Sequence, residues 1–145
     1  MVADESILRL RINVLHPVKG IALKMQRGRE ELVDPSTASA ARVTFDFTVR
    51  VAGRPGGQPN FLGEFTQGPP ASRFVYINAG TYAGQAGTTW GRRAKIPLTG
   101  ITRALVDKAR RADGVLAVDI EGTGRDGGPA AATVEPLGAG WRLEE

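Results

Sequence analysis

The sequence feature that most constrains the fold is a long stretch in which apolar and polar residues alternate. Its apolar residues are Val43, Phe45, Phe47, Val49 and Val51, and a single polar or charged residue separates each from the next. Successive side chains of a strand point to opposite faces of its sheet, so this period of two places the apolar residues on one face. Residues 7–15 repeat the pattern. Alternation of this kind is typical of antiparallel sheets with one face in water, and it predicts a β-rich fold.

Apolar and β-branched segments elsewhere predict further strands, bounded by turns rich in glycine and proline. We expect them near residues 21–26, 61–65, 73–79, 93–98, 115–121, 131–137 and 141–143. One helix is expected from Thr99 or Gly100 to about Ala112, with Thr99 as its N-cap. Gly114 is placed to end that helix. These elements predict an α+β fold: a mainly antiparallel sheet, or a partly closed barrel or sandwich, of about eight short strands with one α-helix near residues 99–112.

The length and composition are those of an ordinary globular chain. A chain of 145 residues is expected to form a single domain, residues 1–145, around its own core. The acidic start, Met-Val-Ala-Asp-Glu-Ser, and the lack of a long apolar segment predict a cytoplasmic protein without a membrane span. The chain has no cysteine and a single histidine, His16, which excludes disulfides, thiolate zinc sites and most histidine metal sites. No metal or cofactor is therefore expected.

The first of two glycine-rich segments covers residues 80–93, which we expect to form a loop of about fourteen residues. Its aromatic residues can stack on a ligand, its glutamine can form hydrogen bonds, and its paired arginines can bind an anion. The candidate ligand-binding residues are Tyr82, Gln85, Trp90, Arg92 and Arg93. Alternatively, the tryptophan fills the core while the arginines pair with acids or face water.

The second glycine-rich segment, residues 122–129, matches the dinucleotide-binding pattern G-x-G-x-x-G after an expected strand. That pattern must open a helix whose N-terminus meets the pyrophosphate, whereas Pro129 and a β-prone segment follow here. We interpret the segment as a hairpin loop. Arg125 and Asp126 can project from this loop towards a ligand, and they complete the set of candidate binding residues.

Candidate catalytic groups are restricted to carboxylates, because no serine lies in a nucleophile-elbow pattern and His16 precedes a proline. Asp46, Glu121 or Asp126 can serve as a base, and the acids near the second glycine-rich segment offer oxygens to a divalent cation. Pairing of Asp119 and its neighbours with arginines on adjacent strands explains the same residues without any chemistry. Whether the protein is an enzyme is left open, and the sequence favours a non-enzyme.

Nucleic-acid binding is not expected, although residues 84–111 are rich in lysine and arginine and the net charge is +4. The chain contains no sequence signature of an RNA-binding sheet. The aromatic residues that would supply a stacking platform are Phe45, Phe47, Phe74 and Tyr76. All of them are expected in the core, which removes the platform.

Two long motifs stand out: RRAKIPL at residues 92–98 and GTGRDGGP at residues 122–129. The stretch that contains them, from about residue 73 to residue 141, resembles a bacterial family of small proteins classed as a domain of unknown function. The resemblance places both glycine-rich segments among the hallmarks of that family. It implies no activity, so the expected function comes from the residues themselves.

The expected function is that of a non-catalytic binding module for a small anionic ligand or an acidic protein partner, bound through the two glycine-rich segments. The first alternative is a small hydrolase- or lyase-type enzyme with a carboxylate base in a glycine-lined cleft. The second is a structural or assembly protein that presents an edge strand to a partner. A homodimer is compatible with each of these functions.

Overall fold

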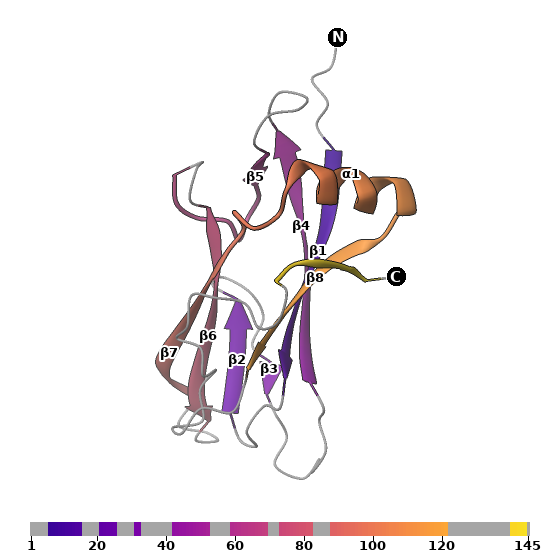
Figure 1. Ribbon diagram of the computed structural model, residues 1–145. Helices are drawn as coiled ribbons and strands as arrows, with labels where there is room; N and C mark the ends of the chain where they lie inside the picture. Colours follow the sequence, from indigo (N-terminus) through magenta and orange to yellow (C-terminus); the bar gives the residue numbers. More distant parts are fainter. Residues whose placement is uncertain are drawn as a thin grey trace.

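The computed structural model describes residues 6–15, 21–25, 31–32, 42–52, 59–69, 73–82, 88–121 and 140–144. The strands are β1 (Ser6–Leu15), β2 (Ile21–Met25), β3 (Glu31–Leu32), β4 (Arg42–Ala52), β5 (Asn60–Leu62), β6 (Phe74–Tyr82), β7 (Thr88–Pro97), β8 (Val115–Glu121) and β9 (Arg142–Glu144). One helix, α1 (Arg103–Ala112), lies across the upper end of the strands in Figure 1. The described part of the chain is therefore mostly β with one helix, in agreement with the expected α+β class.

The larger sheet holds five strands in the order β5-β4-β1-β8-β9. β1 and β4 are antiparallel along the length of β1, from Ser6 opposite Val51 to Leu15 opposite Arg42. β1 and β8 are parallel, and the other described pairs in this sheet are antiparallel. Parallel strands need a crossover connection, and the chain between β1 and β8 includes α1.

The smaller sheet holds four antiparallel strands in the order β3-β2-β6-β7. The loop expected at residues 80–93 is wrong over most of its length, because β6 continues to Tyr82 and β7 begins at Thr88. The pairing of β6 with β7 shifts its register between Ala79 and Gly80. A glycine inside a strand often marks such a bulge, and here Gly91 of β7 is the residue that the register skips, so strand pairing continues beyond it.

The two sheets share one apolar core and do not close into a barrel, since no described strand belongs to both. Buried residues alternate along β1 and β4 as the sequence predicts. The core includes Leu10 and Ile12 of β1, Phe45 and Phe47 of β4, Val75 and Ile77 of β6, and Leu116 and Val118 of β8. One face of each sheet is therefore apolar, and the opposite faces are available for polar side chains.

The helix begins later than expected, with Thr102 as its N-cap in place of Thr99. The Thr102 hydroxyl accepts a hydrogen bond from the Leu105 N–H at 3.2 Å. Just before it, Leu98 and Ile101 are both fully buried, and the Ile101 N–H donates to the Leu98 carbonyl at 3.0 Å. This buried turn keeps the chain out of the helix until Thr102.

The helix ends at Asp113 in the left-handed conformation (φ 50°), one residue before the glycine expected to end it. Aspartate is among the residues that tolerate this conformation. Gly114 gives room to a neighbouring strand, because a Cβ atom there would lie 2.6 Å from Leu143 Cδ1 in β9 and the end of that leucine side chain would have to shift. The glycine thus allows β9 to approach the start of β8 closely.

Two further expectations concern strand boundaries. A strand is expected at residues 61–65, whereas β5 ends at Leu62 and a turn follows it. In this turn the Gly63 N–H donates to the Thr66 hydroxyl at 3.0 Å, and the hydroxyl donates to the Gly63 carbonyl at 3.1 Å. The expected strand 131–137 lies outside the described residues.

Across the described ranges, no helix has both the length and the apolar character needed to span a bilayer.

Candidate binding surface

The outer face of the four-stranded sheet, the side turned away from the core, is partly aromatic. Val75 and Ile77 of β6 are buried. The residues that alternate with them, Phe74, Tyr76 and Asn78, therefore lie on the other side of the strand, where each is partly exposed. The core placement expected for the two aromatic residues is wrong, whereas the phenylalanines of β4 are buried as expected.

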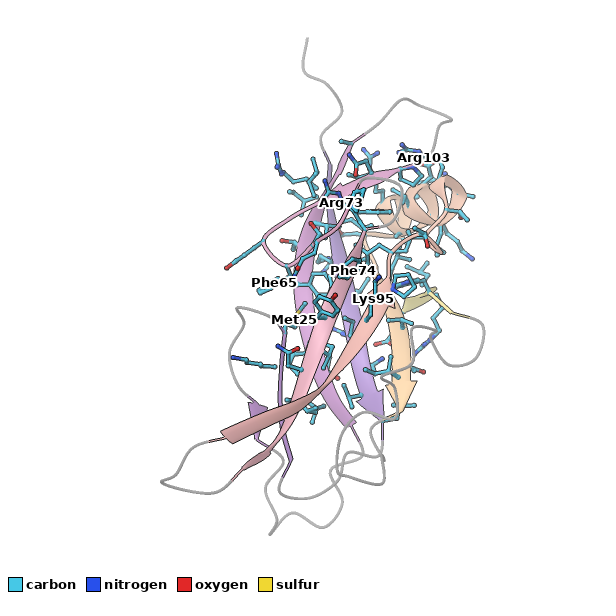
Figure 2. The ribbon with its side chains drawn as sticks, turned by 90° about the vertical axis from the view of Figure 1, so that its left-hand side faces the viewer. Met25, Phe65, Arg73, Phe74, Lys95 and Arg103 are labelled. Carbon is cyan, nitrogen blue, oxygen red and sulfur yellow. The ribbon has the colours of Figure 1, made fainter. Side chains whose placement is uncertain are left out.

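A lysine from the neighbouring strand lies against this aromatic pair. The rings of Phe74 and Tyr76 pack edge to face, with centroids 4.8 Å apart and planes at 68°. The Nζ atom of Lys95 lies 4.3 Å from the centroid of the Phe74 ring. Lys95 is the register partner of Tyr76, and Figure 2 looks onto this side of the sheet with Phe74 and Lys95 labelled. This geometry is that of a cation–π contact.

The strands of this surface contain more positive than negative residues. The sequences of β2, β6 and β7 contain Lys24, Arg92, Arg93 and Lys95 but no aspartate or glutamate. Lys24 and Arg93 are the register partners of Asn78, one on each side of β6. The short strand β3 adds a single acid. A local excess of cations attracts anions, so the sheet is suited to an anionic ligand.

Asn78 lies between Lys24 and Arg93 in the register, and the oxygen of its side-chain amide has no hydrogen-bond partner in the described structure. Its Oδ1 atom is buried and accepts no hydrogen bond in the described structure. Leaving an amide oxygen buried and unsatisfied costs about 1–3 kcal/mol, so a protein retains it where something else requires the residue. We define the candidate binding surface as the side chains of Lys24, Phe74, Tyr76, Asn78 and Lys95.

The sequence-derived site residues fall into two groups. Those in the paired strands β6 and β7 are Tyr82, Trp90, Arg92 and Arg93. Those outside the described residues are Gln85, Arg125 and Asp126. The register brings Arg93 beside Asn78 and Arg92 beside Ala79, so the first group adjoins the candidate binding surface along the chain. A contribution from the second glycine-rich segment stays a prediction.

Sequence reasoning missed this surface because β6 is apolar on both faces. Between residues 74 and 77 an aromatic residue alternates with an aliphatic one, so the period of two does not show which set faces the core. The usable signal is Asn78, because it shares the face of the two aromatic residues and marks that face as the wetter one. Lys95 follows from the same signal once its strand is paired with β6.

The outer face of the five-stranded sheet is also polar, but its charges are paired. Arg11 of β1 donates from Nε to Asp46 Oδ1 at 2.7 Å and from a terminal nitrogen to Glu144 Oε1 at 2.6 Å. Arg142 of β9 lies 3.1 Å from oxygens of both Glu144 and Asp119. Hydrogen bonds to Asp46 and then to Glu144 raise the pKa of Arg11 above its ordinary value. We call these five residues the charge network.

Asn13 extends the charge network into the interior. Its side chain is fully buried, and it is the one buried polar residue among those the structure describes. Its Nδ2 atom donates to Asp119 Oδ1 at 2.9 Å, and its Oδ1 atom accepts from the Thr44 hydroxyl at 3.0 Å. Both ends of this amide are therefore used, which is the condition under which a buried polar group is tolerated.

The carboxylates considered as catalytic bases belong to the charge network where their side chains are described. Asp46 is held by Arg11, and Asp119 is held by Arg142 and Asn13, which confirms the cross-strand pairing expected for Asp119. The side chain of Glu121, the last residue of β8, is not described. Within the described ranges, no three His, Asp or Glu side chains gather so as to hold a metal ion. A carboxylate already bound to a guanidinium is a poor general base.

Two shallow hollows adjoin the charge network, with volumes of about 340 and 300 Å³. They share Asp46 and Thr48 of β4. The larger one is also lined by Arg50 and Glu64, and the smaller one by Arg9 and Arg11. Neither lining has charges of one sign, so these hollows do not select an anion as strongly as the basic strands of the other sheet.

These features define a mostly β protein with one helix, one sheet face whose charges are paired, and one sheet face that is basic and aromatic. The chain belongs to the family of unknown function DUF5990, whose family model matches residues 8–144. The resemblance seen in the sequence is thereby confirmed, and the match extends towards the N-terminus beyond residue 73. No curated protein and no solved structure matches the chain.

Proposed function

We propose that this protein is a non-catalytic binding module for an anionic ligand, and that the candidate binding surface makes the main contact. The observation that supports this most directly is the Lys95 ammonium over the Phe74 ring, on strands that contain other cations and no acids. The proposal keeps anion binding through Arg92 and Arg93 as the sequence suggests. Arg125 and Asp126 belong to it as contributors from the second glycine-rich segment.

The charge network favours binding over catalysis. Its described carboxylates are held by arginines and by Asn13, so their negative charges are already balanced. In the other sheet, β2, β6 and β7 contain cations and no acid, and the described strand β3 contributes the single acid Glu31. An anion can therefore be bound on that sheet without breaking an existing ion pair of the charge network.

The proposal is tested by thermal unfolding of the purified chain with inorganic phosphate, citrate, mononucleotides and poly-glutamate. A ligand that binds the native state alone, at a hundred times its Kd, adds about 2.7 kcal/mol to the free energy of unfolding. For a chain of this size such a gain raises Tm by several degrees. We expect at least one of these anions to do so.

Lys95→Ala is the decisive variant, and Lys108→Ala is its matched control. Lys108 is an exposed lysine on α1, so its removal changes the net charge equally without touching the candidate binding surface. We expect Lys95→Ala to reduce the shift in Tm and Lys108→Ala to leave it unchanged. Arg92→Ala tests the sequence-derived part of the site in the same assay. A shift that survives Lys95→Ala in full, or no shift with any anion, would overturn the proposal.

A further inference from the structure

We propose that the ligand of the candidate binding surface is single-stranded nucleic acid, an inference that rests on the proposed function and names its ligand class. The chemistry of such a strand has two repeating parts, a flat base and a phosphate. Proteins that bind it without strict sequence preference combine aromatic side chains, on which bases stack, with a cationic surface that follows the backbone. Both components occur together on β6 and its two neighbouring strands.

The aromatic component is the Phe74–Tyr76 pair. The two rings lie on one side of β6, partly exposed, and pack edge to face at 4.8 Å. Packing edge to face fixes both rings while each stays partly exposed, so the pair offers a rigid apolar platform. A carboxylate-rich peptide makes little use of such a platform, whereas a nucleobase stacks on it. The rings therefore favour nucleic acid over an acidic protein.

The cationic component is too widely spread for one small anion. Lys24 is the register partner of Asn78 and Lys95 is the register partner of Tyr76, on the two strands that flank β6. Strands on either side of a third strand lie about 9–10 Å apart, and the offset of two residues along β6 adds to the separation of the two backbone positions. Cations that far apart suit a ligand with several anionic groups in series, as in a polynucleotide backbone.

Asn78 adds a group suited to the edge of a base. Its amide lies between Lys24 and Arg93 in the register, and its Oδ1 atom accepts no hydrogen bond in the described structure. If that amide rotates towards a ligand, its oxygen gives up no existing hydrogen bond. The donors that such an oxygen can accept from are the amino groups of adenine, cytosine and guanine and the N3–H groups of thymine and uracil.

The sequence gives two reasons against nucleic-acid binding, and the structure removes one of them. That expectation places Phe74 and Tyr76 in the core, and they lie on the outer face instead. The other ground, the lack of an RNA-binding signature, still holds. The surface is therefore an aromatic and basic sheet face of its own kind, and the inference depends on its geometry alone.

The test is fluorescence anisotropy of the full chain with labelled twelve-residue oligo-dT and oligo-U, a length within the roughly 4–16 nucleotides that one binding fold covers. We expect saturable binding that weakens as salt rises, because each phosphate contact releases counterions. Lys95→Ala is expected to reduce the salt slope by about one. Phe74→Leu is expected to weaken binding by roughly tenfold, because leucine keeps the apolar contact but loses the stacking surface.

Phe65→Leu is the matched control for loss of a ring. Phe65 packs edge to face with Phe47 at 6.1 Å, against the core rather than on the candidate binding surface. We expect it to leave oligonucleotide affinity unchanged. Circular dichroism and thermal unfolding confirm that each variant is folded. Should Phe74→Leu fail to fold, competition on the unmodified chain between unlabelled oligonucleotide and poly-glutamate of equal charge gives the same answer.

The outcomes separate this inference from the proposed function. If poly-glutamate competes as well as the oligonucleotide, or Phe74→Leu binds as tightly as the unmodified chain, nucleic acid is the wrong class and the surface binds an acidic protein. The proposed function survives that result, provided that Lys95→Ala still weakens binding of poly-glutamate. If the oligonucleotide and every other anion fail to bind, both proposals are wrong.

Discussion

The two sheets of this protein each contain an asparagine in a central strand, and the two amides differ in how their polar atoms are satisfied. Asn13 of β1 is fully buried, with a donor contact to Asp119 and an acceptor contact from Thr44. Asn78 of β6 has a buried oxygen that accepts no hydrogen bond in the described structure. The first amide is satisfied within its own sheet, whereas the second has an oxygen that the described structure does not use.

The charges around the two asparagines follow the same division. Around Asn13, Arg11 and Arg142 are each shared between two carboxylates. Around Asn78, the register partners are Lys24 and Arg93, and the neighbouring strands contain no acid. Strand alternation produces a polar outer face in both sheets, but β2, β6 and β7 contain cations and no acid of their own. We expect the charge network to contribute to stability, and we propose the basic face as the surface for recognition.

The largest effect on stability is expected at Asn13. Asn13→Val leaves the Thr44 hydroxyl without its acceptor and Asp119 without one of its donors. We expect the free energy of unfolding to fall by about 2–3 kcal/mol, the range for a buried polar partner that is lost. Urea denaturation of the variant and the unmodified chain measures the difference. A loss smaller than that of a surface substitution would show that this amide does not hold the charge network together.

Removal of Arg11 is expected to cost less, because its ion pairs are partly exposed. Arg11→Met loses the contacts to Asp46 and Glu144, for which we expect a loss of about 1–2 kcal/mol that shrinks as salt rises. The raised pKa of Arg11 means that its guanidinium stays charged until strong alkali, where its share of the ion pairs is lost. A double-mutant cycle with Glu144→Gln isolates the pair. Zero coupling in that cycle would contradict a network.

Asn78→Val should have the opposite sign. The substitution removes a buried oxygen that accepts no hydrogen bond, so the free energy of unfolding should stay equal or rise by up to about 1 kcal/mol. Measured beside Asn13→Val, this variant tests the comparison directly, because the two changes are chemically identical. If the free energy of unfolding falls as much as it does for Asn13→Val, the two amides contribute equally to stability and the comparison is wrong. Binding of the oligonucleotide is expected to weaken in the same variant.

The smallest effect on stability is expected at Lys95, where the effect on binding is expected to be large. Its cation–π contact is made by an exposed lysine, so Lys95→Ala should change the free energy of unfolding by no more than about 0.5 kcal/mol. Denaturation and anisotropy on the same preparation compare the two quantities. If stability falls more than affinity does, Lys95 supports the fold rather than the ligand.

Much of the β framework could be predicted from the sequence, since β1 and β4 each have one apolar and one polar face. The alternation locates both strands and identifies their buried residues. The parallel pairing of β1 with β8 could not be predicted, because no local pattern encodes which distant strand becomes a neighbour. The helix start was misplaced because Thr99 and Thr102 are both acceptable caps, and burial of Leu98 and Ile101 decides between them.

The candidate site was predicted less well, for related reasons. The sequence predicts a loop where β7 holds Trp90 and Arg92, since it does not reveal that a bulge at Gly91 keeps β7 paired with β6. The aromatic residues of β6 were assigned to the core because hydrophobicity alone does not choose between two apolar faces. What the sequence does contain is the basic character of this region, which is retained in the surface we propose.

The parallel pair at the centre of the five-stranded sheet has a consequence for the order in which the protein can form. Asn13 and Asp119, which are joined by a hydrogen bond across this pair, are separated by 106 positions. During synthesis, β1 can find β4 early, but its other edge has no partner until β8 has left the ribosome. Closing so long a loop is costly and slow compared with forming hairpins. For most of its synthesis, the chain therefore has an open strand edge in what will become its interior, and its folding must wait for the last quarter of its own sequence.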